Sequence, residues 1–171
     1  MNNKLVFRHE VRPGDLEIVR EMIISTGFFY DIEVPVALEL LEDRIEEGDR
    51  SSYHFVFAEI DGKPVSYTCF GPIAGAEGSF DLYWIVTHND YRGRGIGNLI
   101  LEETHREIRK MGGRLVIAET SSLEKYAPTR HFYLKMGYTD EARIADFYKM
   151  GNLRVGIAYT KQQGFDIGVF I

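Results

Sequence analysis

The sequence is short of several features, and each shortage excludes a class of protein. It has a single cysteine, Cys69, so no internal disulfide can form and nothing requires an oxidising compartment. No apolar run approaches the roughly 18 residues that span a bilayer, and the start, Met1-Asn2-Asn3-Lys4, lacks the apolar core of a signal peptide. We therefore expect a cytoplasmic protein with no membrane segment.

Positive charge is also scarce, with 20 Lys and Arg against 26 Asp and Glu and a net charge of −6. A negative surface repels the phosphate backbone, which argues against general nucleic-acid binding. Basic residues do cluster once, at Arg92-Gly93-Arg94. Elsewhere the acidic excess is compatible with cationic partners such as amines, and equally with ordinary solubility.

What is present indicates one folded domain over residues 1–171. The chain is 44% hydrophobic and 13% aromatic, enough for a self-sufficient core, and it has no repeat or low-complexity tract. The pattern predicts strand, two helices, hairpin, strand–helix–strand, helix and hairpin, a mixed α/β sheet with one right-handed crossover. The predicted strands are 5–8, 53–60, 64–70, 79–87, 114–119, 138–147 and 152–161, and the predicted helices run over about 15–27, 35–48, 95–111 and 128–136.

Three local features of this pattern carry further expectations. Glycine, apolar residues and a threonine share one face of the longest predicted helix, which we expect to be buried. That face holds Gly97, Ile100, Leu101, Thr104, Ile108 and Met111. The strand after it, 114–119, resembles the buried parallel type. The last hairpin turns at 149–151, and no feature decides how the tail 162–171 is placed.

The most informative segment joins a predicted strand to the longest helix and reads Tyr91-Arg92-Gly93-Arg94-Gly95-Ile96-Gly97-Asn98. Three alternate glycines let a ligand approach the backbone closely. The helix start offers unpaired N–H groups and the positive end of its dipole, which together bind anions. Arg92 and Arg94 can add charge-assisted contacts to phosphate oxygens. The segment predicts a pyrophosphate site.

Two common phosphate motifs do not fit this segment. The dinucleotide pattern G-x-G-x-x-G, counted from Gly93, would need a third glycine where Asn98 stands. No Gly-Lys-Ser/Thr follows, so the Walker A loop is absent. A nucleotide enzyme with a fully parallel sheet is further disfavoured by the hairpin turn Asp61-Gly62.

Two motifs resemble the GNAT superfamily of N-acetyltransferases. Arg92-Gly93-Arg94-Gly95-Ile96-Gly97 fits R/Q-x-x-G-x-G/A, that family's acetyl-CoA pyrophosphate loop. Thr129-Arg130-His131-Phe132-Tyr133-Leu134-Lys135-Met136-Gly137-Tyr138 resembles its helix-4 signature, a tyrosine followed by a Gly-aromatic pair. The element order from Leu5 to Lys161 also matches. The resemblance implies a mixed, mostly antiparallel sheet whose central parallel pair splays apart to hold acetyl-CoA, flanked by about four helices.

The resemblance also implies how acetyl-CoA binds. The pantetheine arm would pair with the backbone near Ile85 and Val86, and the Val86 N–H would polarise the thioester carbonyl. The loop would hold the pyrophosphate. The residues so assigned to the coenzyme are Ile85, Val86, Thr87, Arg92, Gly93, Arg94, Gly95, Ile96, Gly97 and Asn98.

Acyl transfer to an amine needs a group that takes the amine's proton and a group that serves the departing thiolate. Tyr133 matches the family tyrosine that donates a proton to the sulfur, while a core aromatic is the alternative. The base is less defined. Glu119 is our first candidate because it ends a cleft strand, where burial would raise its pKa; Asp81, Tyr83 and His88 are others.

The resemblance implies that acceptor specificity comes from the link between the first two helices, 28–33, and from the last hairpin, 146–149. Phe29, Tyr30, Glu33 and Tyr83 form aromatic and acidic walls suited to a compact amine, an amino acid or a peptide. Core packing or a dimer contact by the same aromatics is the alternative.

The chain departs from the family pattern at two positions before the tyrosine. Many members have asparagine and alanine where Tyr126 and Thr129 stand, so a hydroxyl of Thr120, Ser121 or Ser122 would have to replace the usual contact to pantetheine. No histidine shows metal-ligand spacing, and we assign no metal. We expect an acetyltransferase that is a monomer or homodimer, and the alternative is a non-catalytic CoA-binding sensor or partner-binding module on the same fold.

Overall fold

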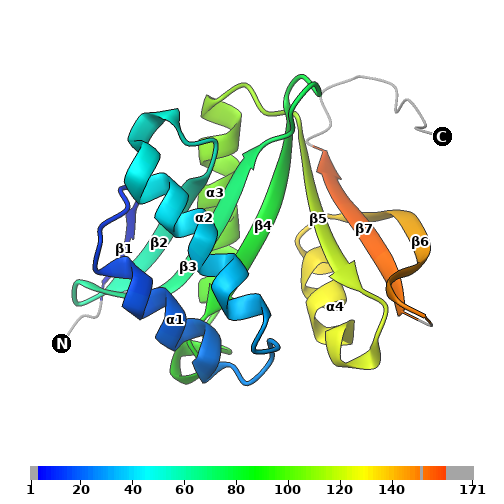
Figure 1. Cartoon of the computed structure of the whole chain (residues 1–171), viewed down its shortest axis with the longest axis horizontal. Helices are drawn as coiled ribbons and strands as arrows, with labels where there is room; N and C mark the ends of the chain where they lie inside the picture. The colour runs from blue at the N-terminus through cyan, green and yellow to red at the C-terminus, as the bar shows by residue number, and fades with distance from the viewer. Residues whose placement is uncertain (1–3, 151, 161–171) are drawn as a thin grey trace. The chain divides into compact units, whose positions relative to one another are not determined.

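A computed structural model of the chain describes residues 4–150 and 152–160. The elements follow one another in the predicted order (Figure 1). The strands are β1 (Leu5–Arg8), β2 (His54–Ile60), β3 (Lys63–Pro72), β4 (Ser79–Thr87), β5 (Leu115–Ser121), β6 (Thr139–Lys149) and β7 (Asn152–Thr160), and the α-helices are α1 (Asp15–Ser25), α2 (Glu33–Glu47), α3 (Ile96–Lys110) and α4 (Ala127–Lys135). The tail 162–171, and parts of the last predicted turn and strand at 151 and 161, lie outside the described residues.

The chain divides into two compact units, residues 1–113 and 114–171. In the first, β1 to β4 pair antiparallel in sequence order. The predicted hairpin between β2 and β3 turns at Asp61 and Gly62, whose φ angles of 51° and 76° are both positive. Two such residues make the turn that matches the twist of paired strands, which is why Asp-Gly predicts it.

Helices cover both faces of this four-stranded sheet, α1 and α2 on one face and α3 on the other (Figure 1). The core under α1 and α2 includes Tyr67 and Cys69 of β3. Thr68, between them on the opposite face, hydrogen-bonds through its hydroxyl to the hydroxyl of Thr104 on α3 at 2.7 Å. The core cluster consists of Val19, Met22, Ile23, Ala37, Leu38, Leu41, Phe55, Phe57, Tyr67, Cys69 and Val86.

The second unit is a three-stranded antiparallel sheet with β7 in the centre, between β5 and β6. The predicted strand 114–119 was expected to be buried on both faces. Instead β5 alternates, with Val116 and Ala118 buried and Glu119 exposed. β5 pairs antiparallel with β7, and an antiparallel sheet commonly packs one face on the core and leaves the other in water, which gives this alternation.

The predicted fold class is confirmed: the protein is a mixed α/β fold with mostly antiparallel strands and four α-helices in the described residues. Of the predicted parallel pair, β4 belongs to the first unit and β5 to the second. One predicted core residue is wrong. Met111 is 44% exposed, because α3 ends at Lys110 and Met111 caps it. No helix in the described residues is long and apolar enough to cross a bilayer.

Candidate active site

The predicted pyrophosphate loop forms a tight turn into α3. Gly93 and Gly95 have φ angles of 73° and 78°, in the left-handed region that L side chains rarely adopt. Gly95 is the residue that caps the helix start. A Cβ at either position would meet nothing within 4 Å, so the backbone conformation, and not crowding, requires glycine there.

This turn leaves a row of backbone N–H groups that have no partner in the part of the chain that the structure describes. The Arg92 N–H donates to the Asn89 carbonyl oxygen at 3.3 Å, and the Asn98 N–H donates to the Gly95 carbonyl oxygen at 3.1 Å. Between them, no backbone acceptor among the described residues serves the N–H groups of 93–97. Five successive bare donors at the positive end of a 15-residue helix suit a diphosphate.

The two arginines of the loop lie at its surface, and both are exposed. Arg94 donates to the Asp90 carbonyl oxygen at 2.8 Å, and its guanidinium lies 5.1 Å from the Tyr91 ring centre. These contacts hold the Arg94 side chain over the turn that precedes the bare N–H groups. Asn98 is half-buried in the first turn of α3.

The strand that leads into the loop, β4, carries a β-bulge beside its predicted coenzyme residues. Trp84 faces Cys69 and Leu82 faces Phe70, so Tyr83 is the extra residue. A bulge re-aims side chains and ends regular pairing, and bulges are frequent beside active sites. Nothing in the local sequence indicated it.

The register of β4 decides which of its backbone groups face β3. The His88 N–H donates to the Val65 carbonyl oxygen at 2.9 Å. Because donors alternate along an antiparallel strand, Val86, opposite Tyr67, also directs its N–H toward β3. Ile85 and Thr87 direct theirs toward the other edge of β4.

Two of the predicted acceptor residues make aromatic contacts at β4: Phe29 packs against Trp84 of this strand, and Tyr83, which lies on it, packs against Tyr53. The Phe29 ring lies 5.2 Å from Trp84, and the Tyr83 ring lies 5.5 Å from Tyr53. Burial, with Asp81 contributing, raises the pKa of Tyr83 to about 12, so its phenol is protonated at neutral pH. Sequence reasoning missed Tyr53 and Trp84, because only the pairing of β2, β3 and β4 brings them to this place.

Tyr30 and Glu33 form a turn just before α2. The Glu33 carboxylate accepts the Tyr30 N–H at 2.6 Å, and the Glu33 N–H donates to the Tyr30 carbonyl oxygen at 2.9 Å. The Tyr30 side chain is 52% exposed, whereas Phe29 packs against the core. The core-packing alternative therefore describes Phe29 and not Tyr30.

In the second unit, Tyr133 is a buried residue of α4. Its side chain is 5% exposed, and its ring centre lies 5.0 Å from that of Tyr138. Burial raises the pKa of Tyr133 well above its ordinary value. The phenol therefore stays protonated at neutral pH and can donate a hydrogen bond.

Glu119 is placed differently from what a buried base would need. It is exposed on β5 and forms an ion pair with Arg154 of β7, whose guanidinium lies 4.8 Å from the Phe147 ring centre. Among the other candidates, half-buried His88 accepts the Asp90 N–H on Nδ1 at 3.3 Å. That bond leaves its Nε2 for other partners.

The structure separates two of the three hydroxyls that the sequence left as equivalents. The Ser121 hydroxyl already has two hydrogen-bond partners within the protein: it donates to Asn152 Oδ1 at 2.7 Å and accepts the Leu123 N–H at 3.1 Å. Thr120 is buried, and its hydroxyl has no hydrogen-bond partner among the described residues. An unpaired buried hydroxyl costs about 1–3 kcal/mol, which a bound ligand can recover.

Comparisons with known proteins bear on the family and the fold. Residues 51–140 match the model of the acetyltransferase (GNAT) domain. A protein from Desulfovibrio desulfuricans assigned to the GNAT family is 40% identical, with a TM-score of 0.90 over 92% of this chain and 99% of that one. No curated protein matches.

Two more distant structures share the fold. An aminoglycoside 6'-N-acetyltransferase solved with coenzyme A is 15% identical, with a TM-score of 0.72 over 94% of this chain and 99% of that one. The ribosomal-protein-S18-alanine N-acetyltransferase from Escherichia coli is also 15% identical, with a TM-score of 0.70 over 98% of this chain and 100% of that one. The domain match and the 40% identical relative show that this chain belongs to the GNAT family of acetyltransferases.

Proposed function

We propose that the protein moves an acetyl group from acetyl-CoA to a primary amine of a small molecule, amino acid or peptide, by direct attack in a ternary complex. The observation that carries the proposal is the row of bare N–H groups from Gly93 to Gly97 at the start of α3. These donors fit the diphosphate of coenzyme A, and membership of the family supplies the acetyl chemistry.

The coenzyme arm would extend from this loop along β4. The register of β4 favours Ile85 and Thr87 as its backbone partners, since their polar groups point away from β3. We therefore propose the Ile85 N–H, in place of the Val86 N–H expected from the family resemblance, as the donor to the thioester carbonyl. The unpaired hydroxyl of Thr120 is our candidate for the contact that the family's asparagine makes.

Tyr133 would serve the departing thiolate. Burial raises the pKa of Tyr133, so its phenol keeps its proton well above neutral pH and can donate a hydrogen bond throughout the reaction. A donor held on a helix by packing against Tyr138 needs no reorganisation when charge develops on sulfur.

Glu119 would accept the proton of the attacking amine, directly or through water. Its exposed position gives solvent access, and the ion pair with Arg154 orients the carboxylate. His88, with Nε2 available, is the alternative acceptor.

For the acceptor we propose a compact amine held by Phe29, Tyr30, Glu33 and Tyr83. Aromatic faces attract ammonium groups, and the protonated Tyr83 phenol offers both a donor and an acceptor. The Glu33 carboxylate has a second oxygen besides the one that accepts the Tyr30 N–H.

The deciding experiment measures free thiol released from acetyl-CoA with a panel of polyamines, amino acids, aminoglycosides and peptides. Release that depends on both acetyl-CoA and one amine class supports the enzyme and names its acceptor. Tight coenzyme binding by calorimetry without turnover on any acceptor would instead support a CoA-binding sensor. If the protein does not bind the coenzyme, both the enzyme hypothesis and the sensor hypothesis are wrong.

A further inference from the structure

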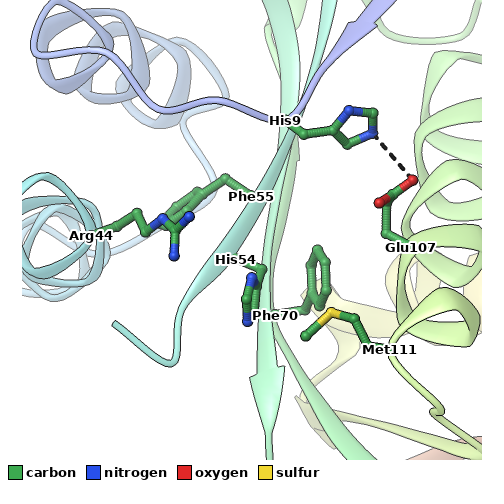
Figure 2. Close-up of a pocket in the computed structure, with 7 residues that line it drawn as sticks. All are labelled: His9, Arg44, His54, Phe55, Phe70, Glu107 and Met111. Atoms are coloured by element: carbon green, nitrogen blue, oxygen red, sulfur yellow. Dashed lines mark ion pairs between the residues drawn. The ribbon is translucent and has the colours of Figure 1, made fainter. Parts of the chain in front are cut away.

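A cluster of three potential metal ligands lies in the first unit, on residues that the acyl-transfer proposal does not use. His9 follows β1, and Glu103 and Glu107 lie one turn apart on α3. His9 Nε2 is 3.1 Å from Glu103 Oε1 and 3.6 Å from Glu107 Oε1. Figure 2 shows the His9 ring directed at Glu107. One ligand atom from each of the three residues lies within 4.8 Å of the others.

These separations suit a bound transition-metal ion. Zinc binds imidazole nitrogen and carboxylate oxygen at about 2.0–2.2 Å, so tetrahedral ligand atoms lie roughly 3.3–3.6 Å apart. Both measured distances are close to that range. We propose that His9, Glu103 and Glu107 form a binding site for a divalent transition-metal ion, with Zn²⁺ as the favoured occupant.

The chain beside His9 and the Glu103 side chain are held in place before any ion binds. Arg8, the residue before His9, donates to both oxygens of Asp15 at 2.8 Å and to Glu59 at 2.6 Å, which anchors the end of β1. The Glu103 side chain is 7% exposed and lies on a long helix. A preorganised ligand set loses little conformational entropy on binding.

Two cationic side chains, Arg106 and Lys110, already bind the carboxylates of the cluster, and each affects metal binding differently. Arg106 binds Glu103 through Oε2, so Oε1 stays directed at His9. Lys110 Nζ lies 2.6 Å from Glu107 Oε1, the oxygen nearest His9, and therefore competes with a metal. The Lys110 side chain is 63% exposed, so this ion pair is weak and its ammonium can move into solvent.

Two of the three proposed ligands, His9 and Glu107, border a cavity of about 150 Å³. His9 and Glu107 line it together with His54, Arg44, Phe55, Phe70 and Met111 (Figure 2). A polar cavity of this size holds water, which would complete the coordination of three protein ligands. The ion would join the segment after β1 to α3 across 94 residues of sequence and stabilise the folded unit.

The test uses the full chain, freed of metal by a chelator and then titrated with Zn²⁺ against a chromophoric competitor. We expect one zinc per chain, and His9→Ala and Glu107→Gln should each weaken binding at least tenfold. Glu102→Gln, an exposed carboxylate on the same helix, is the matched control and should bind as the wild type does. Lys110→Met should bind severalfold more tightly because the competing ammonium is gone.

Two further readouts separate a site from surface adsorption. Co²⁺ should give the absorption bands of a tetrahedral ion with the wild type and not with His9→Ala. At saturating Zn²⁺ the midpoint of thermal unfolding should rise by about 5–10 °C in the wild type, since a ligand at 100 times its Kd adds about 2.7 kcal/mol. Zinc affinity that is the same in wild type and in folded His9→Ala, or falls in Lys110→Met, would overturn the proposal.

Discussion

Apart from the acceptor-binding side chains, which all lie in the first unit, the two compact units contribute different kinds of chemical group to the proposed reaction. The first offers backbone: the N–H groups of 93–97 and the outward groups of Ile85 and Thr87. The second offers side chains: the buried phenol of Tyr133 and the ion-paired carboxylate of Glu119. Backbone groups bind the same charge at every pH, whereas side chains move protons. Coenzyme binding and turnover should therefore fail separately when each unit is altered.

The largest effect is expected from Gly95→Trp in the first unit. The bulky residue must adopt a φ near 78°, and the turn that presents the N–H groups will rearrange. Loss of two charge-assisted hydrogen bonds at about 1.5–3 kcal/mol each weakens coenzyme binding by roughly 100-fold or more. Calorimetry with coenzyme A measures it.

Gly75→Trp is the matched control. Gly75 has a φ of 76° and open space around it, but it lies in the turn between β3 and β4, at the end of β4 away from the loop. It should bear the same backbone strain without losing coenzyme affinity. Equal affinities in the two variants would show that the turn at 92–97 does not hold the coenzyme.

Tyr133→Phe in the second unit should lower kcat by about 100-fold, the usual size of a general-acid contribution, with coenzyme affinity unchanged. Steady-state thiol release and calorimetry on the same preparation separate the two quantities. Because burial raises the pKa of Tyr133, wild-type kcat should show no loss from tyrosine ionisation below pH 10. Tyr138→Phe, the neighbouring buried phenol, should keep its kcat; a fall in both variants alike would point to packing and not to proton donation.

The smallest effect is expected from Glu119→Gln, about a tenfold fall in kcat/KM at neutral pH if water replaces the lost base in part. Coenzyme affinity should stay the same. His88→Asn is compared in the same assay. If that variant, and not Glu119→Gln, lowers kcat/KM, the first unit supplies the base and the contrast between the units is less sharp.

The parts of the site that were predictable lie within short stretches of chain. The turn at 92–97 is encoded by alternating glycines next to a helix pattern, so its positive φ angles follow from adjacent residues. The hairpin at Asp61-Gly62 is predictable for the same reason. Tyr133 was found from its place in a local motif, and its burial agrees with both interpretations that the sequence left open.

The parts that were not predictable depend on contacts between distant residues. The Arg154 partner of Glu119 comes from the pairing of β5 with β7, and the bulge at Tyr83 comes from the register of β3 with β4. The sequence gives no reason to distinguish the hydroxyls of Thr120, Ser121 and Ser122. Packing leaves the Thr120 hydroxyl without a partner among the described residues, whereas the Ser121 hydroxyl donates to Asn152.

By itself, the sequence determined the order of the elements, the loop that suits a diphosphate and the family, because glycine conformation and hydrophobic period act over a few residues. Only the tertiary structure decided which edge of β4 each backbone N–H faces, that Glu119 forms an ion pair with Arg154, and that His9 lies beside Glu103 and Glu107. Those outcomes depend on strand register and helix packing, where a shift of one residue turns a side chain to the opposite face.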